Sequence, residues 1–248
     1  MMKQKNPAPG QMVQVKKQNI HVFTKGQGAV TYLLMSGSST RFPVTDFEPL
    51  IQQLHIKNKV VIVDKTGYGW SDLNGSSREI DNIVEEYREA LRLSGHHAPY
   101  TLVPHSLSGL EATYWAKKYP EEVRAIIGLD PAIPDYYEQA KLPPIGLVRL
   151  IARISRNSVI TPGMVDEVRW VKANARKVKD AGKPLDTPVY NFISNRKGVA
   201  VKNWRELQTT YLADFKVQKH KMLECGHYVH RYEAKVIADE MQDFVNNL

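Results

Sequence analysis

The sequence predicts an α/β fold, with helices covering both faces of a mostly parallel sheet. Apolar runs of strand length alternate along the chain with longer segments in which apolar residues recur at helical spacing. Strands and helices that alternate in this way form right-handed βαβ units, and such units build parallel sheets. The 248 residues are enough for one large α/β domain or two small ones.

The N-terminal half of the chain contributes a tail and most of the predicted strands. Residues 1–12 are rich in Pro, Gly and Lys, so we expect a flexible tail. Residues 13–15 and 20–23 alternate apolar and polar side chains around a polar break, which predicts an antiparallel pair. After this pair, the chain contains continuous apolar runs, which are typical of strands buried on both faces. Amphipathic segments, predicted to be helices, separate these runs. These predicted strands are 30–35, 60–63, 101–103 and 123–129, and the helices are 46–54, 78–94 and 110–119.

The stretch 131–187 is punctuated by Pro and helical, with helices predicted over 145–154 and 162–178. The α/β pattern then returns, with strands at 188–194 and 215–223 and helices at 204–212 and 233–245. Because the stretch lies between two strands, we expect it over the carboxyl ends of the sheet, where open α/β sheets bind ligands. We therefore divide the chain into a core, residues 13–130 and 188–248, and a helical cap or lid, residues 131–187.

Composition narrows the class of protein. The chain has 34 basic and 26 acidic residues, a net charge of +8, and the basic residues are scattered. Scattered charge predicts a solvated surface with at most weak affinity for anionic membranes, and aromatic and basic residues do not interleave as in a nucleic-acid groove. The single Cys225 excludes an internal disulfide. No signal sequence or apolar run of the ~18 residues that span a bilayer is present, so we expect a cytoplasmic protein without stable membrane insertion. The oligomeric state is not predicted.

Polar residues that could carry chemistry follow the predicted strands. Ser106 stands between the strand 101–103 and the helix 110–119. A serine at such a reversal sits on a strained turn with its oxygen exposed, close to the amides that open the helix. This segment alone could equally be a serine that caps a core helix, since Pro104 and Ser108 replace the glycines of the G-x-S-x-G motif. Asp130 follows the next strand, and His227 follows the last one.

Taken together, these residues resemble the α/β-hydrolase superfamily, from about residue 13 to the C-terminus. The resemblance implies the α/β-hydrolase fold, with a small helical cap between the sixth and seventh strands, and a serine nucleophile at Ser106. The motifs that carry it are Ser36-Gly37 where the family has His-Gly, Asp64-x-x-Gly67-x-Gly69-x-Ser71, His105-Ser106-x-x-Gly109 and Gly226-His227.

A catalytic serine requires a base and an acid that orients the base. His227 is the candidate base, because the imidazole pKa near ~6.5 allows it to accept and return a proton. Most of the family places the acid after the next-to-last strand, but no carboxylate lies between Asp186 and Glu206, and Asp186 is at the wrong end of that strand. A minority places it one strand earlier, where Asp130 lies. The alternative is that Asp130 only ends a strand, while Asn195 or a water orients His227.

Several further residues are expected around this site. The oxyanion hole would consist of the backbone N–H groups of Ser38 and Leu107. His230 is expected to begin the final helix or to line the entrance. Apolar side chains of the cap are expected to line the substrate pocket: Ile133, Pro134, Tyr136, Leu147, Leu150, Ile151 and Ile154.

No cofactor and no metal are expected. Cys225, His227 and His230 lack a second cluster of ligands, so they are a weak metal motif. The glycines Gly67 and Gly69 are followed by Asp72, where a dinucleotide-binding motif would have its third glycine.

The predicted function is a cofactor-independent serine hydrolase that cleaves small or medium carboxylic esters through an acyl-enzyme on Ser106. A serine nucleophile disfavours the chemistry of dehalogenase-like and epoxide-hydrolase-like relatives, which use aspartate. The alternative from another class is a ligand-sensing or signalling protein that retains these residues with little turnover. Lactone, thioester and carbon–carbon bond hydrolases and aminopeptidases would use the same residues.

Overall fold

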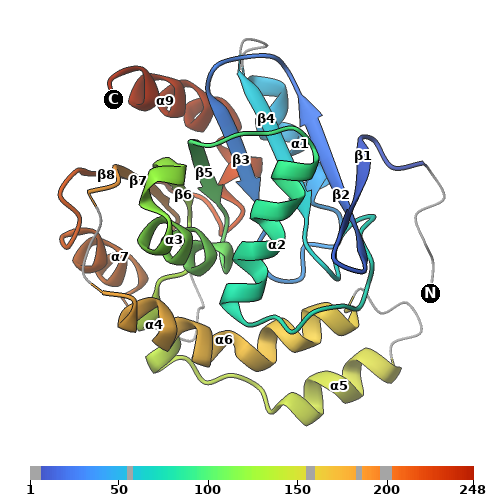
Figure 1. The fold of residues 1–248 in the computed structure, drawn as a ribbon. Helices are drawn as coiled ribbons and strands as arrows, with labels where there is room; N and C mark the ends of the chain where they lie inside the picture. The colour runs from blue at the N-terminus through green and yellow to red at the C-terminus, as the bar shows by residue number, and fades with distance from the viewer. Residues whose placement is uncertain (1–6, 55–57, 155–159, 183–185, 196–202) are drawn as a thin grey trace.

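A computed structural model describes residues 7–54, 58–154, 160–182, 186–195 and 203–248. Within these ranges, eight strands form one sheet in the order β1-β2-β4-β3-β5-β6-β7-β8 (Figure 1). The strands β1, β2 and β4 pair antiparallel, and every pairing from β4 through β8 is parallel. The strands are β1 (Gln11–Val15), β2 (Gln18–Lys25), β3 (Thr31–Met35), β4 (Lys59–Asp64), β5 (Tyr100–Pro104), β6 (Val123–Leu129), β7 (Val189–Ile193) and β8 (Gln218–Met222).

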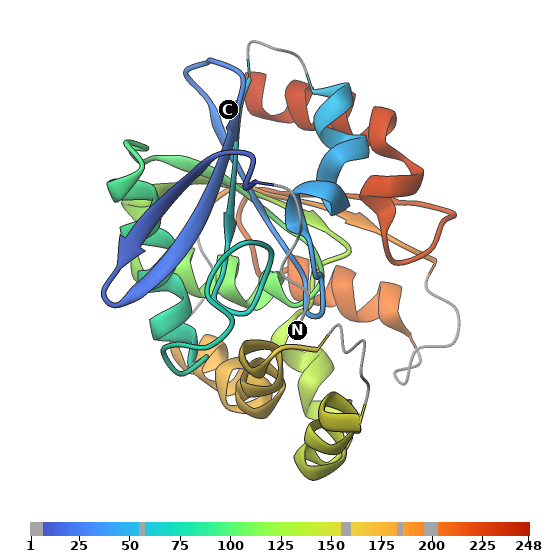
Figure 2. The same cartoon turned by 90° about the vertical axis from the view of Figure 1, so that its right-hand side faces the viewer.

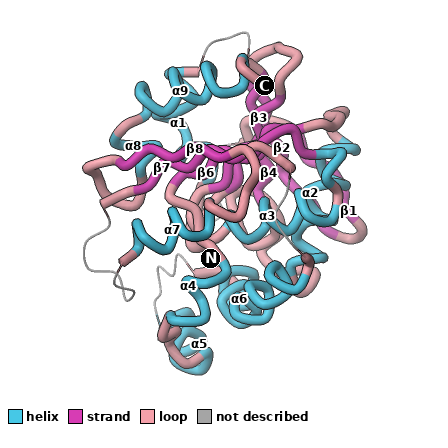
Figure 3. The backbone as a smooth tube through the Cα atoms, turned by 90° about the vertical axis from the view of Figure 1, so that its left-hand side faces the viewer, coloured by secondary structure: helices cyan, strands magenta, loops and turns pink. Residues whose placement is uncertain are grey.

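The helices form layers on both faces of the sheet. Helices α1 and α9 cover one face, and α2, α3 and α7 cover the other (Figure 3). Helices α4, α5 and α6 lie beyond the second layer, on its outer side (Figures 2 and 3). None of the helices within the described ranges combines the length and the apolar character needed to cross a membrane. The helices are α1 (Pro43–Gln53), α2 (Ile80–Leu93), α3 (Ser108–Lys118), a 3-10 turn (Pro120–Glu122), α4 (Pro134–Gln139), α5 (Ile145–Ile154), α6 (Pro162–Asp180), α7 (Trp204–Leu212), α8 (Val229–Tyr232) and α9 (Ala234–Asn246).

The central strands are largely apolar because both faces of the sheet are buried. In β3, Leu33 and Met35 pack in the cluster formed with α2 and α3. Tyr32 and Leu34 point to the opposite face and pack in the cluster formed with α1 and α9. All four side chains are fully buried. A strand in this environment loses the alternation of polar and apolar residues, which explains the continuous apolar runs in the sequence.

The predicted α/β fold, the antiparallel N-terminal pair and the mostly parallel sheet are confirmed. The short helices α4 and α8 were not predicted, because a helix of four to six residues is too short to show a full amphipathic period. The last strand begins at Gln218, later than the predicted 215. Phe215 is apolar because it packs in the core from the turn before β8. Lys219 and Lys221 lie on this edge strand, where charged side chains discourage pairing with another chain.

Candidate active site

Ser106 lies in the sharp turn that joins β5 to α3. Its backbone φ is +55°, a left-handed conformation that is strained for a residue with a side chain. The turn is held from both sides, since the Ser106 carbonyl accepts hydrogen bonds from the Gly109 amide (2.9 Å) and the Ala132 amide (2.6 Å). A Cβ atom at Gly109 would lie 2.4 Å from the Ala132 carbonyl oxygen, so this position requires glycine. The strain at Ser106 is therefore maintained by close packing around the turn.

The two departures from the G-x-S-x-G motif fit this turn. Pro104 is the last residue of β5, and the ladder continues beyond it through the His105 amide, which donates to the Met35 carbonyl (2.9 Å). The buried Ser108 hydroxyl has the Met35 carbonyl as an acceptor at 2.7 Å and the His105 carbonyl at 2.9 Å. Serine at this position thus ties the start of α3 to the end of β3.

The structure brings Ser106, His227 and Asp130 together, as the sequence predicts. The His227 Nε2 atom lies 2.8 Å from Ser106 Oγ, and its Nδ1 atom lies 2.6 Å from Asp130 Oδ2. An ionised carboxylate only accepts hydrogen bonds, so we assign the proton to Nδ1. Nε2 then accepts the hydrogen bond of the Ser106 hydroxyl. The His227 side chain is 19% exposed and Asp130 is fully buried, so solvent can reach the imidazole but not the carboxylate.

Asp130 is held more firmly than a residue that merely ends a strand. Its φ is +48°, and its carboxylate accepts four hydrogen bonds. The Ser194 amide (2.9 Å) and Trp204 Nε1 (2.8 Å) donate to Oδ1, and the Ser194 hydroxyl (2.8 Å) and His227 bond to Oδ2. Buried charge requires such compensation. Ser194 follows β7, His227 lies in the loop after β8 and Trp204 begins α7, so the fold fixes this carboxylate from several directions.

The other candidates for the acid are turned elsewhere. The Asn195 side chain donates to Glu224 Oε2 at 3.0 Å, in an exposed position. The Asp186 side chain is 85% exposed and pairs with Lys216. Asp130 is therefore the group that orients His227 in this structure, and the alternative of Asn195 is not supported by the geometry.

The His227 ring packs against the buried ring of His105, which in turn packs against that of His230. The His105 ring centroid lies 4.7 Å from that of His227 and 4.6 Å from that of His230. His105 Nε2 lies 3.3 Å from the His227 carbonyl oxygen, so Nε2 carries the proton and donates. Burial and the neighbouring histidines His230 and His227 hold the pKa of His105 well below its usual range, which keeps this ring neutral.

The structure corrects the expectation for His230. This residue lies in α8, before the final helix, and it is fully buried, so it neither begins α9 nor lines an entrance. Its Nε2 atom bonds to Asp46 Oδ2 at 3.1 Å. Burial lowers the pKa of His230, although Asp46 opposes this shift. Sequence patterns could not reveal the pairing, because its partner is 184 residues away.

One group within the described ranges could hold a metal ion by proximity. The ligand atoms of Asp46, His105 and His230 lie within 4.8 Å of one another. However, the other oxygen of Asp46 already binds the guanidinium of Arg231, whose Nε donates at 2.7 Å. Arg231 already supplies the positive charge that Asp46 pairs with, so the residues fit an ion pair better than a metal site.

The loop after β3 lies directly against the elbow. A Cβ atom at Gly37 would lie 2.8 Å from Ser106 Cβ, so only glycine allows this approach. Ser39 has a φ of +63°, and its amide donates to the Tyr68 hydroxyl at 3.3 Å. In the described part of the chain, the Ser38 and Leu107 amides donate to no other residue. Their role as oxyanion donors stays a prediction.

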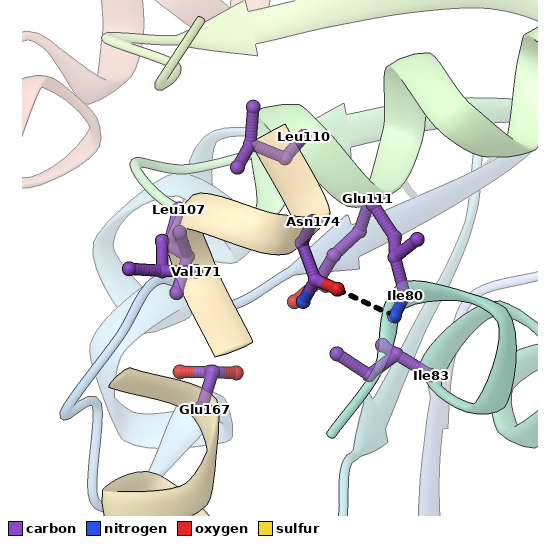
Figure 4. A pocket seen from close by; sticks show the side chains of 8 residues that line it. All are labelled: Ile80, Ile83, Leu107, Leu110, Glu111, Glu167, Val171 and Asn174. Carbon is purple, nitrogen blue, oxygen red and sulfur yellow. Dashed lines mark hydrogen bonds between the residues drawn. The ribbon is translucent and has the colours of Figure 1, made fainter. Parts of the chain in front are cut away.

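A small cavity, with room for about one water molecule, adjoins Leu107, the residue after the nucleophile. It lies where α2, α3 and α6 meet, and Leu107 forms part of its wall (Figure 4). The lining residues are Ile80, Ile83, Leu107, Leu110, Glu111, Glu167, Val171 and Asn174. The sequence predicts none of these as pocket residues; it predicts Leu107 only as a backbone amide donor.

The predicted pocket residues of the cap lie elsewhere. On α5, Leu147, Leu150 and Ile151 are 48–50% exposed and do not line this cavity. The reason is that α5 packs on α6, and α6 contributes the cavity wall. In α4, Pro134 is buried, and the Tyr136 ring packs 5.4 Å from that of Trp204. Ile133 is buried in the core, and the side chain of Ile154 lies outside the described residues.

Helix α6 is bound to the core by polar contacts. The Thr161 hydroxyl donates to the Gly67 carbonyl at 2.8 Å, and the Gly163 amide bonds to the Leu73 carbonyl at 3.2 Å. Lys65 and Glu167 form a fully buried ion pair of 2.6 Å. The loop after β4 therefore anchors the start of α6, which fixes the wall of the cavity.

Comparison with known proteins agrees with this architecture. The family model of the alpha/beta hydrolase fold matches residues 46–161. A candidate α/β hydrolase of known crystal structure, ALR0039 from Nostoc sp PCC 7120, superposes with a TM-score of 0.79 over 96% of this chain and 98% of that one. The two sequences are 16% identical, so this likeness shows the fold alone.

Curated relatives match part of the chain. The uncharacterized protein YbdG of Bacillus subtilis (strain 168) is 39% identical over 141 residues, which are 57% of this chain and 43% of YbdG. The 2-(acetamidomethylene)succinate hydrolase of Mesorhizobium japonicum is 30% identical over 119 residues, 48% of this chain and 41% of that enzyme. The chain thus spans less than half the length of these two relatives.

Proposed function

We propose that the chain is a serine hydrolase of the α/β-hydrolase superfamily that acts on carboxylic esters, a proposal supported by the family match and by the contacts among Ser106, His227 and Asp130. The observation that carries the proposal is the unbroken hydrogen-bond relay from a strained serine, through one imidazole, to a buried carboxylate. A serine hydroxyl becomes a useful nucleophile at neutral pH when a base accepts its proton during attack.

The reaction follows from the direction of these hydrogen bonds. Ser106 Oγ attacks the ester carbonyl while its proton passes to His227 Nε2, and the resulting imidazolium is stabilised by Asp130. The tetrahedral intermediate collapses, and the alcohol leaves with the proton from Nε2. Water then attacks the acyl group with His227 as the base, which releases the carboxylic acid and restores the Ser106 hydroxyl.

The negative oxygen of each tetrahedral intermediate needs hydrogen-bond donors. The Leu107 amide opens α3 beside the nucleophile, and the Ser38 amide follows Gly37, which lies against the Ser106 side chain. Donors fixed in advance stabilise the charge that develops during the reaction, and removing one typically costs about 10²–10³ in kcat. We assign the oxyanion hole to these two amides.

Hydrolysis of other acyl compounds would use the same groups. The relative from Mesorhizobium japonicum is a hydrolase by name, which supports hydrolysis in general and leaves the bond type open. Among these options we propose carboxylic esters of small or medium size, and the graded series of esters below tests the size. The groups assigned to catalysis all belong to the protein, so the proposed reaction uses no cofactor.

The proposal is tested with p-nitrophenyl esters of graded chain length and with a fluorophosphonate probe. Wild-type protein should hydrolyse the shorter esters and become labelled on Ser106. Ser106→Ala should lose both properties, and Ser77→Ala, a serine outside the site, should retain them. If Ser106 is unlabelled in the folded protein, or Ser106→Ala hydrolyses as fast as wild type, the proposal is wrong. A folded, unreactive wild type would favour the ligand-sensing alternative.

A further inference from the structure

Helix α5 forms an outer edge of the molecule, where it packs on α6 (Figures 1 and 2). Three of its large apolar side chains are exposed to solvent. Leu147, Leu150 and Ile151 are 48%, 50% and 49% exposed, and their spacing of three and four residues places them on one face of the helix. Val148 and Ala152 lie on the other side and are half-buried. The helix is therefore amphipathic, but its apolar face is the exposed one.

This group differs from the other exposed apolar side chains of the described residues. No two of the others share a helix face, and the large ones are Met12, Leu93, Val217, Met222, Tyr232 and Leu248. Single exposed apolar residues are normal on protein surfaces, whereas a contiguous group with polar residues around it marks an interaction site. The charge around α5 indicates which kind of partner fits this site.

The part of the chain that contains α5 and α6 is strongly basic. Residues 141–179 contain nine basic and two acidic residues, a net charge of +7 (9 − 2). The remaining 209 residues contain 25 basic and 24 acidic residues, so this stretch carries nearly all of the chain's net charge of +8. The basic residues are spread along the chain, and the excess arises here because acidic residues are scarce.

Little of this positive charge is neutralised within the protein. Both acids of the stretch are already paired, since Glu167 is buried with Lys65 and Asp166 lies 3.7 Å from Arg169. Two lysines of α6 pair with acids of other helices. Four exposed basic side chains form no ion pair within the described residues: Lys141, Arg149, Lys172 and Arg176. These four are available to an anionic partner.

We propose that the exposed face of α5 docks reversibly on a bilayer that contains anionic lipids. The helix lies in the plane of the interface, with Leu147, Leu150 and Ile151 at the boundary between headgroups and acyl chains and the basic side chains of α5 and α6 at the lipid phosphates. Long basic side chains keep their charge in the headgroup layer while their stems cover apolar surface. Three apolar side chains bury little area and surface charge is screened by salt, so binding requires both contributions.

Two other occupants of this face fit the observations less well. A second copy seated face to face would bring two stretches of like charge together, and three side chains fall far short of the roughly 800 Å² per partner that a standard interface buries. A nucleic acid would match the charge but not the aliphatic side chains, because single strands stack on aromatic rings. A bilayer matches both the apolar and the basic part of the surface.

The test is co-sedimentation of the full chain with phosphatidylcholine vesicles, either pure or with about one-third phosphatidylglycerol. The wild type should bind the mixed vesicles at least about tenfold more tightly than the pure ones, and high salt should reduce this preference. The double variant Leu150→Gln/Ile151→Gln should bind the mixed vesicles at least about tenfold more weakly than the wild type. Leu93→Gln, which changes a side chain that is 40% exposed on α2, should bind as the wild type does. Equal binding of the wild type to both kinds of vesicle, or equal binding of the double variant and the wild type, would overturn the proposal.

Two further measurements locate the contact and require no catalysis. Mixed vesicles should slow the hydrogen exchange of the α5 amides in the wild type, and slowing confined to other elements would overturn the proposal even if the double variant folded poorly. Light scattering in the absence of lipid should give the same mass for the wild type and the double variant. A wild-type dimer that the double substitution converts to a monomer would assign this face to a second copy and would also overturn the proposal.

Discussion

Replacing Asp130 by asparagine tests the part of the account that depends most on geometry. Two backbone or ring N–H groups, from Ser194 and Trp204, donate to Oδ1 and cannot accept a hydrogen bond. The amide oxygen of Asn must therefore take the Oδ1 position, which turns its NH₂ group toward the Ser194 hydroxyl and His227 Nδ1. His227 must then accept at Nδ1 and carry its proton on Nε2, where it can no longer accept the Ser106 proton.

The size of the effect follows from the contacts that oppose the productive tautomer. To restore it, the amide must flip and leave two buried donors without an acceptor. Each such loss costs about 1–3 kcal/mol, so the productive state lies about 2–6 kcal/mol higher. At 1.36 kcal/mol per factor of ten, kcat should fall by about 30-fold to 10⁴-fold. The upper end agrees with the general effect of this substitution in serine triads.

The assay is the steady-state hydrolysis of a p-nitrophenyl ester that the wild type accepts. Asp186→Asn is the matched control, because its side chain is 85% exposed and lies outside the site. We expect a large loss of kcat in Asp130→Asn, near-normal kcat in Asp186→Asn, and covalent labelling that is slowed in proportion to kcat. Activity of Asp130→Asn within tenfold of the wild type would refute the reasoning about the tautomer.

Three further predictions concern the surroundings of the site. Tyr68→Phe removes the acceptor of the Ser39 amide, next to the proposed oxyanion donor Ser38, so kcat should fall by about tenfold with little change in KM. The control Tyr87→Phe removes a buried hydroxyl that has no partner and should not alter kcat. Equal kcat values in the two variants would contradict this prediction. The pKa of Asp46 is lowered below 3.8: burial opposes this shift, but hydrogen bonds and charges from the adjacent histidine and arginine outweigh it. The free energy of unfolding that Asp46→Asn loses should therefore be largest above pH 3.8 and smaller at lower pH. Denaturant titrations measure this loss, and a loss that does not depend on pH would contradict the prediction. Burial, with nearby carboxylates, raises the pKa of Cys225 to about 11. Because the thiolate is the reactive form, iodoacetamide at pH 8 should alkylate Cys225 about 100-fold more slowly in the folded than in the unfolded protein. Similar alkylation rates, measured by mass spectrometry, would count against this prediction.

Much of the site could be predicted from the sequence, because each residue of the relay follows a recognisable strand. Ser106 follows β5, Asp130 follows β6 and His227 follows β8, and the carboxyl ends of parallel strands meet at one edge of the sheet. The choice of Asp130 over Asn195 also followed from strand order. The partners of Asp130 could not be predicted, because Trp204 is 74 residues away and its sequence context is an ordinary helix.

The cavity and its ion pairs could not be predicted for a physical reason. Glu111 and Glu167 are charged residues within helices, and in a sequence such residues indicate the solvated face. Their buried charges are compensated by Lys65, which directly follows β4 and lies between them. The opposite error occurred in α5, where the apolar residues Leu147 and Leu150 are exposed although the pattern indicated a buried face. The periodicity of apolar residues predicts that a helix has an apolar and a polar face. It does not predict which face packs against the core.

The central claim is that Ser106 carries the acyl group during turnover. Mixing the wild type with p-nitrophenyl acetate, quenching in acid within the first turnovers and measuring the intact mass tests it directly. We predict a transient species heavier by one acetyl group, located on the peptide that contains Ser106, formed no later than the first equivalent of p-nitrophenol and absent from Ser106→Ala. Catalytic release of p-nitrophenol with no acyl adduct, or with an adduct on another residue, would contradict the account.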